Sequence, residues 1–200
     1  MDKKFVVTIG REFGSGGREV GEKLAKQLQV AFYDKNIIDI VAEKNGIKAR
    51  YLEKEDEKAA NPFEEPYIPY GIDTGTLSER LFRMQAKVIT EKANTESCVI
   101  VGRCADYILE EDADACHVFI FADEDDRIAR IVRKRHLEEE EAYKLIKKQD
   151  KIRRSYYQFY TDRKWGTREG KDLLINTSAT GIDGAVAIIV QFLKSKGYIE

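Results

Sequence analysis

The sequence predicts an α/β protein built on a doubly wound parallel sheet of about five strands. Three observations support this fold class. Short apolar runs recur along the chain, segments with helical periodicity fill the intervals, and a glycine-rich turn follows the first apolar run. Strands that are apolar throughout are typical of parallel sheets covered by helices on both faces, so three layers are expected.

The strands follow from apolar runs or period-two alternation: Phe5–Ile9, Ser97–Val101, Cys116–Phe121, Asp172–Ile175 and, more weakly, Val30–Tyr33. Helical periodicity predicts helices over Glu19–Gln29, Asn36–Asn45, Ser78–Asn94, Asp123–Lys134, Glu138–Tyr160 and Asp183–Lys196. Because strand and helix signals alternate, the strands should be joined by crossover helices and run parallel.

One polar stretch, residues 46–77, breaks this alternation and holds all three prolines, Pro62, Pro66 and Pro69. A helix around Ala49–Ala59 is expected to precede the prolines. A long polar segment inside a compact fold is typically functional, so we interpret it as an insertion that covers or clamps a substrate.

Composition limits the classes of function. The chain has 200 residues and a formal net charge of −2, so residues 1–200 suit a single domain, and no nucleic-acid or membrane partner is indicated. Cys98, Cys104 and Cys116 lack metal-ligand spacing and are interpreted as reduced thiols. The first apolar run is too short for a signal peptide or a membrane span. We therefore expect a soluble cytoplasmic protein of undetermined oligomeric state.

The glycine-rich turn in FVVTIGREFGSGGREVGEKLAKQL is the most informative stretch. A strand, a glycine turn and a helix in that order bring backbone N–H groups and a helix dipole to one point, which favours phosphate. The residues expected to bind the phosphates are Gly14, Ser15, Gly16, Gly17, Arg18 and Glu19. A tight-packing turn without a ligand is one alternative. A dinucleotide fingerprint is another, although no convincing acidic residue closes a second strand at the required distance.

The turn departs from the usual phosphate-binding pattern, in which a Lys is followed by Ser or Thr. Those two positions fall near Gly17 and Arg18. Arg18 is expected to supply the missing charge to the β- and γ-phosphates and so to act catalytically, with Lys35 or Arg11 as the next candidates. Ser15 carries the only hydroxyl of the turn, and the metal ligands stay unassigned.

Five segments in order, TIGREFGSGGREVGEKLAKQL, FYDKNIIDIVAE, CVIVGRCADYIL, HVFIFADEDDRIARIV and LLINTS, closely resemble the cytidylate-kinase-like family of P-loop nucleoside-monophosphate kinases. The resemblance implies a P-loop NTPase-type fold. It also implies an inserted monophosphate-binding segment at roughly 35–95 and an arginine-rich lid at roughly 134–168. It further implies ATP and Mg²⁺ as cofactors and CMP or dCMP as the acceptor.

The resemblance also assigns roles to single residues. Arg103, in the Gly-Arg pair after a central strand, is expected to clamp the acceptor phosphate, and Asp106 is expected either to orient Arg103 or to hold an acceptor group. The other acceptor contacts implied are Asp34, Lys35, Asp150, Arg153 and Arg154. Thr177 and Ser178 would contact the donor base. Arg127, Arg130 and Arg133 lie three residues apart on one helix stripe, and lid arginines of related kinases cross the transferred phosphoryl group.

Three functions stay open at this point: a kinase of CMP or dCMP, a nucleotide- or phosphate-binding protein without transfer activity, and a kinase of another small acceptor. Neither histidine suggests a catalytic arrangement. His117 lies in an apolar strand and is interpreted as a satisfied core residue, whereas His136 lies on a charged helix and is expected to be solvated.

Overall fold

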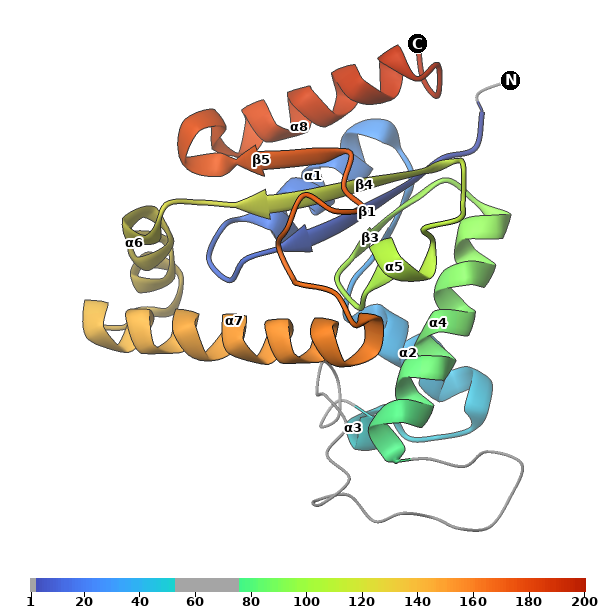
Figure 1. Cartoon of the computed structure of the whole chain (residues 1–200), viewed down its shortest axis with the longest axis horizontal. Coiled ribbons are helices and arrows are strands. Elements are labelled where there is room, and N and C mark those ends of the chain that lie inside the picture. The colour runs from blue at the N-terminus through green and yellow to red at the C-terminus, as the bar shows by residue number, and fades with distance from the viewer. Residues whose placement is uncertain (1–2, 53–75) are drawn as a thin grey trace.

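The computed structural model of the chain describes residues 3–52 and 76–200. Its centre is one five-stranded, all-parallel sheet with the strand order β2-β3-β1-β4-β5 (Figure 1). The strands are β1 (Val6–Arg11), β2 (Ala31–Tyr33), β3 (Cys98–Val101), β4 (Ala115–Phe121) and β5 (Leu173–Asn176). The expected α/β fold with a parallel sheet is therefore confirmed, including the weaker fifth strand.

The first strand lies in the middle of the sheet. β1 pairs with β3 from Val6 opposite Cys98 to Ile9 opposite Val101, and with β4 as far as Arg11 opposite Ile120. β1 is paired on both sides as far as Ile9, and its last two residues, Gly10 and Arg11, from which the glycine-rich turn departs, are paired with β4 alone. In open α/β sheets ligands collect at this edge, where the chain crosses from one side of the sheet to the other.

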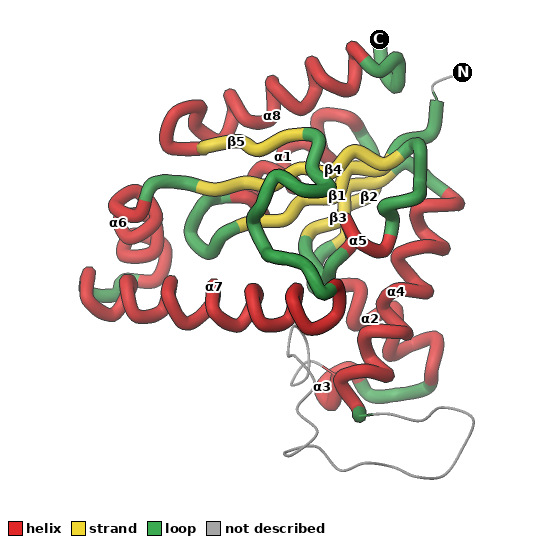
Figure 2. Tube along the Cα trace, in the orientation of Figure 1, coloured by secondary structure: helices red, strands yellow, loops and turns green. Residues whose placement is uncertain are grey.

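Helices connect and cover the strands (Figure 2). Those in the described residues are α1 (Gly17–Leu28), α2 (Asn36–Asn45), α3 (Ala49–Leu52), α4 (Leu77–Thr95), α5 (Ala105–Ile108), α6 (Glu124–Arg135), α7 (Glu139–Thr161) and α8 (Thr177–Ser195). The helix expected around Ala49–Ala59 is described only as far as Leu52. The remainder of that helix and all three prolines lie outside the described residues.

The last helix begins earlier than its periodicity predicted, at Thr177 rather than Asp183. The side chain of Asn176 caps it by accepting a hydrogen bond from the backbone N–H of Ser178 at 2.9 Å. Gly181, with φ 66° and ψ 178°, then kinks the helix in a conformation that only glycine adopts readily. This non-helical residue interrupts the pattern on which the prediction depended.

Apolar side chains divide between the two faces of the sheet. Val7 and Ile9 of β1 point into a core shared with α1 and α8, whereas Val6 points into a second core shared with α2 and α4. Figure 1 shows α8 on one side of the sheet and α4 and α7 on the other. The result is the expected three-layer arrangement, with α6 and α7 beyond the carboxyl edge of the central strands.

Buried titratable groups in the sheet behave as structural residues. Cys98, Cys104 and Cys116 are buried and form no disulfide, and burial raises the pKa of the Cys98 and Cys116 thiols to about 12. His117 is buried in β4, its Nδ1 is 2.8 Å from Thr8 Oγ1, and its backbone N–H donates to Asp172 Oδ2 at 2.7 Å. The interpretation of His117 as a satisfied core residue is confirmed.

His117 should make stability depend on pH. Burial lowers the pKa of its imidazole below the usual 6.5. As the pH falls below 6.5, the imidazole of His117 therefore binds a proton in the unfolded chain but stays neutral in the folded chain. The free energy of unfolding should decrease over this range, by at most about 1.4 kcal/mol per pH unit from this group. Urea denaturation between about pH 5 and pH 8 should show this dependence in the wild type and lose it in His117→Gln.

The other histidine offers a matched control. His136 is exposed at the end of α6 with φ 54°, a backbone conformation that Asn tolerates. His136→Asn should keep the pH dependence of the wild type. Equal slopes in the wild type and His117→Gln would contradict a buried neutral imidazole.

Candidate phosphate-binding site

The glycine-rich turn runs from Arg11, at the end of β1, to Gly17, the first residue of α1. Gly14 and Gly16 have φ values of 83° and 84°, which side chains other than glycine rarely adopt. A Cβ on Gly16 would also lie 2.4 Å from Ile182 Cδ1. The turn therefore exposes backbone rather than side chains at the amino terminus of α1, where unpaired N–H groups attract anions.

The hydroxyl of the turn points back into the protein. Ser15 is fully buried, its Oγ donates to the carbonyl oxygen of Glu12 at 2.9 Å, and its own carbonyl accepts from Thr177 Oγ1 at 2.6 Å. Of the predicted ligand contacts, Ser15 and Thr177 thus form hydrogen bonds that hold the turn against the start of α8. Ser178 Oγ accepts from the backbone N–H of Asp123 at 2.9 Å.

A buried ion pair fixes the turn from the opposite side. Arg127, in the first turn of α6, pairs with Asp150 of α7, and both residues are less than a tenth exposed. Asp150 Oδ1 accepts from the N–H of Phe13 at 2.7 Å, and Arg127 Nε donates to the carbonyl of Phe13 at 2.8 Å. We call these three residues the Phe13 clamp. It joins the turn, α6 and α7 in one unit.

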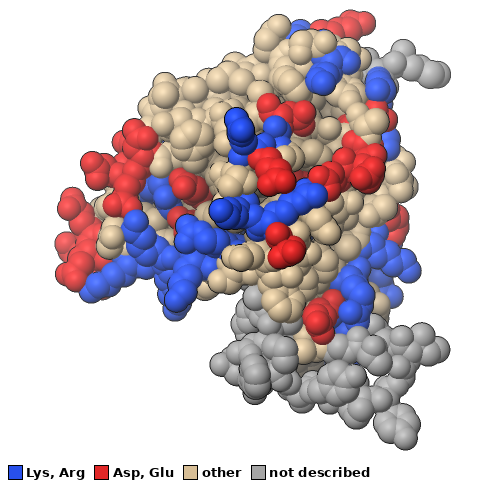
Figure 3. Space-filling model, in the orientation of Figure 1, with Lys and Arg blue, Asp and Glu red and all other residues tan. Residues whose placement is uncertain are grey.

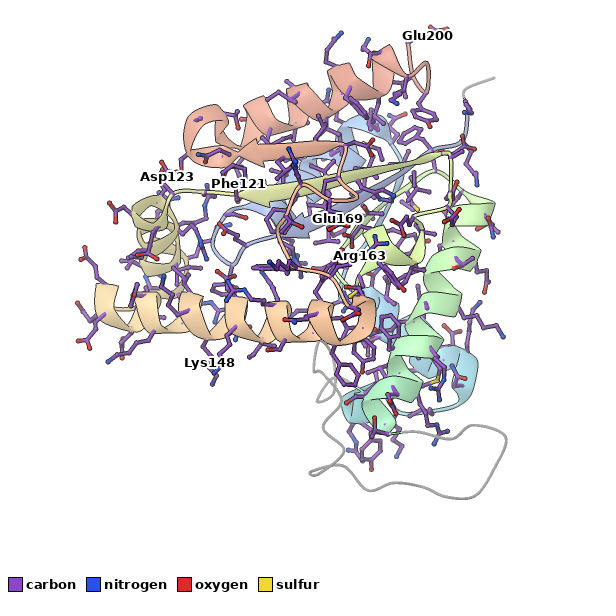
Figure 4. All side chains as sticks on the ribbon, in the orientation of Figure 1. Phe121, Asp123, Lys148, Arg163, Glu169 and Glu200 are labelled. Carbon is purple, nitrogen blue, oxygen red and sulfur yellow. The ribbon has the colours of Figure 1, made fainter. Side chains whose placement is uncertain are left out.

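Glu12 adds a fourth contact to this clamp, and sequence reasoning missed it. Its Oε2 lies 3.1 Å from Arg127 NH1 and accepts from the N–H of Ala122 at 3.3 Å. Burial raises the pKa of the Glu12 carboxyl, while Arg127 opposes that shift. Figure 4 labels Phe121 and Asp123 on either side of Ala122, where the chain leaves β4 for α6. Glu12 thus connects the turn to the end of the neighbouring strand.

The turn opens into a cleft of about 550 Å³ between α1, α6 and α7. Its acidic lining residues are Glu12, Glu19 and Asp34, and its more numerous basic ones are Arg11, Arg18, Lys35, Arg103, Arg130, Lys134, Arg135 and Arg153. In Figure 3, basic side chains gather along α7, while acidic ones gather at the left edge of the view, near α6 and the start of α7. A chain that is slightly acidic in total therefore has a basic cleft, which suits a multiply charged anion.

One wall of the cleft joins several predicted residues through Asp34. Arg103 is only 2% exposed, and its NH1 lies 3.5 Å from Asp34 Oδ1. Arg18 reaches the other oxygen of Asp34, with Nε 3.0 Å from Oδ2, and its NH2 lies 3.2 Å from Glu22. The side chain of Arg18 is 60% exposed. Lys35 is exposed beside this pair, at the start of α2.

The opposite wall is formed by α6. Glu19 of α1 lies 2.8 Å from Lys134 Nζ and 3.5 Å from Arg130 NH1, and the hydrogen bond with Lys134 lowers the pKa of its carboxyl. Arg133 lies outside this cleft and, with Arg130, lines a neighbouring hollow of about 300 Å³ that also includes Thr177 and Ser178. The three arginines of the predicted stripe thus have different surroundings, and only Arg127 is buried in the clamp.

Of the remaining predicted acceptor residues, Asp106 and Arg153 line a small hollow beside the cleft, about 30 Å³ in volume. There Asp106 accepts from the hydroxyl of Tyr157 at 2.9 Å and pairs with Lys171 at 2.6 Å. Lys171 was missed because its burial depends on the fold rather than on a local pattern. The carboxylate of Asp106 is therefore bonded to Tyr157 and Lys171 within this hollow.

Arg153 and Arg154 of α7 point in different directions, because successive residues of a helix lie on different faces. Arg153 NH1 donates to the carbonyl of Arg11 at 3.2 Å, and its guanidinium lies 5.5 Å from the ring centre of Phe13. Arg154 instead lies 6.0 Å from the ring centre of Trp165. Arg153 therefore belongs to the cleft, whereas Arg154 lines a separate hollow of about 250 Å³ with Glu12 and Trp165.

The parallel sheet, the glycine turn and the basic cleft together define the P-loop kinase class of fold. The profile of the cytidylate kinase-like family matches residues 6–179. The chain belongs to the cytidylate kinase-like family. No curated protein matches the chain in sequence.

Solved structures support the same fold. An uncharacterised protein from Eubacterium ventriosum ATCC 27560 is 30% identical, with a TM-score of 0.75 over 96% of this chain and 99% of that one. Shikimate kinase from Acinetobacter baumannii, solved with shikimate, is 16% identical with a TM-score of 0.55 over 98% and 96% of the two chains. Shikimate kinase from Bacteroides thetaiotaomicron is 18% identical with a TM-score of 0.56 over 95% and 98%. The two shikimate kinases are similar in fold alone.

Among residues 3–52 and 76–200, no helix is both long enough and apolar enough to cross a membrane. Within the same part of the chain, His, Cys, Asp and Glu side chains form no group of three or more that could hold a metal ion.

The Phe13 clamp should be a large contributor to stability. Removing one partner of a buried ion pair costs about 3–5 kcal/mol because the other charge stays buried. Asp150→Ala should cost about 3 kcal/mol, the lower end of that range, since Glu12 still contacts Arg127. Urea denaturation measures this loss as a fall in the free energy of unfolding. The double variant Arg127→Met/Asp150→Ala should lose less than Asp150→Ala.

Asp183 provides the matched control, because its carboxylate pairs with Lys23 while its side chain is 87% exposed. Exposed pairs contribute about 0–1 kcal/mol, so Asp183→Ala should be nearly neutral. An Asp150→Ala cost no greater than that of Asp183→Ala would contradict the clamp.

Proposed function

We propose that the protein is a kinase that transfers the γ-phosphoryl group of ATP to a nucleoside monophosphate, CMP or dCMP. One observation carries this proposal. The glycine turn and the start of α1 open into a basic cleft, one wall of which holds the buried Arg103. A polyphosphate on the turn and a monophosphate on Arg103 would therefore approach each other within one cleft.

The donor side fits a triphosphate. Gly14 and Gly16 leave no room for a Cβ, so backbone N–H groups line the floor of the cleft, and the cations of α6 stand opposite. The neighbouring hollow with Arg133, Thr177 and Ser178 is the place proposed for the adenine base. Mg²⁺, which the family implies, neutralises charge on the β- and γ-phosphates when bound. We assign it no ligands in this chain.

The acceptor side is built around Arg103. Its planar guanidinium suits bidentate binding of a phosphate, and Asp34 holds it from the side. Lys35 and Arg153 are proposed as further phosphate contacts because both line the same cleft. Asp106, held by Tyr157 and Lys171, is proposed to contact the sugar or base through the small hollow.

The chemistry asked of these residues is positioning and charge neutralisation. Phosphoryl transfer places negative charge on the oxygens of the transferred group, and fixed cations stabilise that charge without a general base. Arg130 is proposed to act directly, since it lines both the cleft and the adjoining hollow. Arg127 is proposed as a positioning residue because its guanidinium is engaged by Phe13, Glu12 and Asp150. The lid proposed at roughly 134–168 would bring further cations of the cleft, Lys134 and Arg135, toward the phosphates.

Gly17 in place of the usual lysine favours one alternative, a phosphate- or nucleotide-binding protein without transfer activity. Calorimetric titration of ATP, CMP, UMP, AMP and shikimate, followed by an assay of ADP release, separates the possibilities. Release of ADP that depends on CMP or dCMP is the expected result. Binding of ATP with no release for any acceptor would favour the alternative. Release with another acceptor would keep the kinase and reject the cytidylate assignment.

Arg103 should discriminate between donor and acceptor. Arg103→Ala is expected to weaken CMP binding by about one to two decades, because a charge-assisted contact in a buried site contributes about 1.5–3 kcal/mol. ATP binding should change little. Calorimetry with each nucleotide measures both effects, and Lys87→Ala, on the exposed face of α4, serves as the control for lost positive charge. Unchanged CMP affinity in Arg103→Ala would reduce Arg103 to a structural partner of Asp34.

A further inference from the structure

Gly17 stands where P-loop proteins place their phosphate-binding lysine, and its backbone does not explain why it is a glycine. It is the first residue of α1 and, unlike Gly14 and Gly16, does not have a positive φ. Any residue could adopt this conformation. The requirement for glycine must therefore come from what surrounds the position.

The neighbour that excludes a side chain is Arg11. A Cβ on Gly17 would lie 2.5 Å from the Cβ of Arg11, 3.2 Å from its Cγ and 3.2 Å from the Cβ of Ile120. Carbon atoms in contact normally stand about 3.5–4.0 Å apart. The obstructing atoms are the root of the Arg11 side chain, which cannot move away without shifting the central strand. The stem of Arg11 thus passes over the amino terminus of α1, through the space that a lysine at position 17 would need.

We propose that Arg11, from the end of β1, supplies the phosphate-binding charge that a P-loop lysine supplies from the start of the helix. Arg11 lines both the basic cleft and the small hollow beside it, so its side chain borders the donor and acceptor sides together. The proposal rests on the proposed function for its ligand, a polyphosphate chain. It replaces the earlier expectation for Arg18, whose largely exposed side chain binds Asp34 and Glu22.

A long side chain fits at position 11 or at position 17 but not at both, because the two stems would collide. A cation at one of these positions therefore requires a small residue at the other. The chain loses a compact ammonium group and gains a planar guanidinium that can contact two phosphate oxygens at once. The guanidinium is anchored on the strand rather than on α1, at a residue that pairs with Ile120 of β4.

Calorimetry with inorganic tripolyphosphate and with a non-hydrolysable ATP analogue tests this assignment without requiring turnover. Arg11→Met keeps the stem that packs on Gly17 and removes the charge. It should weaken tripolyphosphate binding by about 10- to 100-fold, while Arg18→Met should weaken it less. Lys26→Met removes a charge from the exposed far end of α1 and is the matched control.

A relocation variant sharpens the test. Arg11→Gly/Gly17→Lys removes the obstructing Cβ and restores a lysine at position 17, so it should recover binding to within about tenfold of the wild type, unlike Arg11→Gly alone. Gly17→Lys with Arg11 intact should unfold at lower urea concentration than the double variant, because the two stems collide. If the double variant does not fold, the comparison of Arg11→Met with Arg18→Met decides.

Several results would overturn the proposal: tripolyphosphate affinity in Arg11→Met within about twofold of the wild type, a larger loss in Arg18→Met, or no tripolyphosphate binding by the wild type. These outcomes are separate from the fate of the proposed function. Loss of binding in Arg11→Met in a protein that transfers no phosphoryl group supports the role of Arg11 and rejects the kinase. If the wild type transfers a phosphoryl group and Arg11→Met still binds tripolyphosphate normally, the kinase function is supported and the role of Arg11 is rejected.

Discussion

The glycine turn can bind phosphate only if its backbone is held still, and the Phe13 clamp is the interaction that holds it. Phe13 donates its N–H to Asp150 and accepts from Arg127, so both polar groups of one turn residue are fixed by a single buried ion pair. Because Arg127 belongs to α6 and Asp150 to α7, the same contact positions both helices that wall the cleft. Removing the charges of such a buried ion pair from water costs free energy. The contribution of the pair is therefore to fix one geometry of the turn and the two helices.

The electrostatics of the cleft follow from this arrangement. The chain carries a formal net charge of −2, yet most of the charged residues that line the cleft are basic. Three carboxylates, Glu12, Glu19 and Asp34, hold particular cations in place without cancelling them all. Fixed charges of this kind need no reorganisation when an anion arrives, which is the property that phosphoryl transfer demands of a site. The cytidylate kinase-like family implies nucleotide binding, and the basic lining of the cleft suits the phosphate groups of such a ligand.

The sequence sufficed for the fold and for part of the site. Apolar runs located every strand among the residues that the structure describes, and helical periodicity located the long helices there, because both signals are local. Gly14 and Arg103 could be placed on the cleft from their positions after strands. The roles of Arg127 and Asp150 could not, because a charged helix residue looks solvated until the fold brings its partner from another element. Lys171 was missed for the same reason. The steric conflict between Arg11 and a side chain at position 17 could not be predicted either, because it depends on side-chain volume and not on the spacing of residues in the sequence.

We infer that the glycine turn cradles a polyphosphate although it lacks the usual lysine. A crystal structure of the protein with Mg²⁺ and a non-hydrolysable ATP analogue would show where the phosphates bind. We expect the β-phosphate against the backbone N–H groups between Gly14 and Gly17, with the Arg11 guanidinium on the phosphate chain and the Phe13 clamp unchanged. Phosphates bound elsewhere in the cleft, with the turn N–H groups bonded only to protein or water, would contradict it.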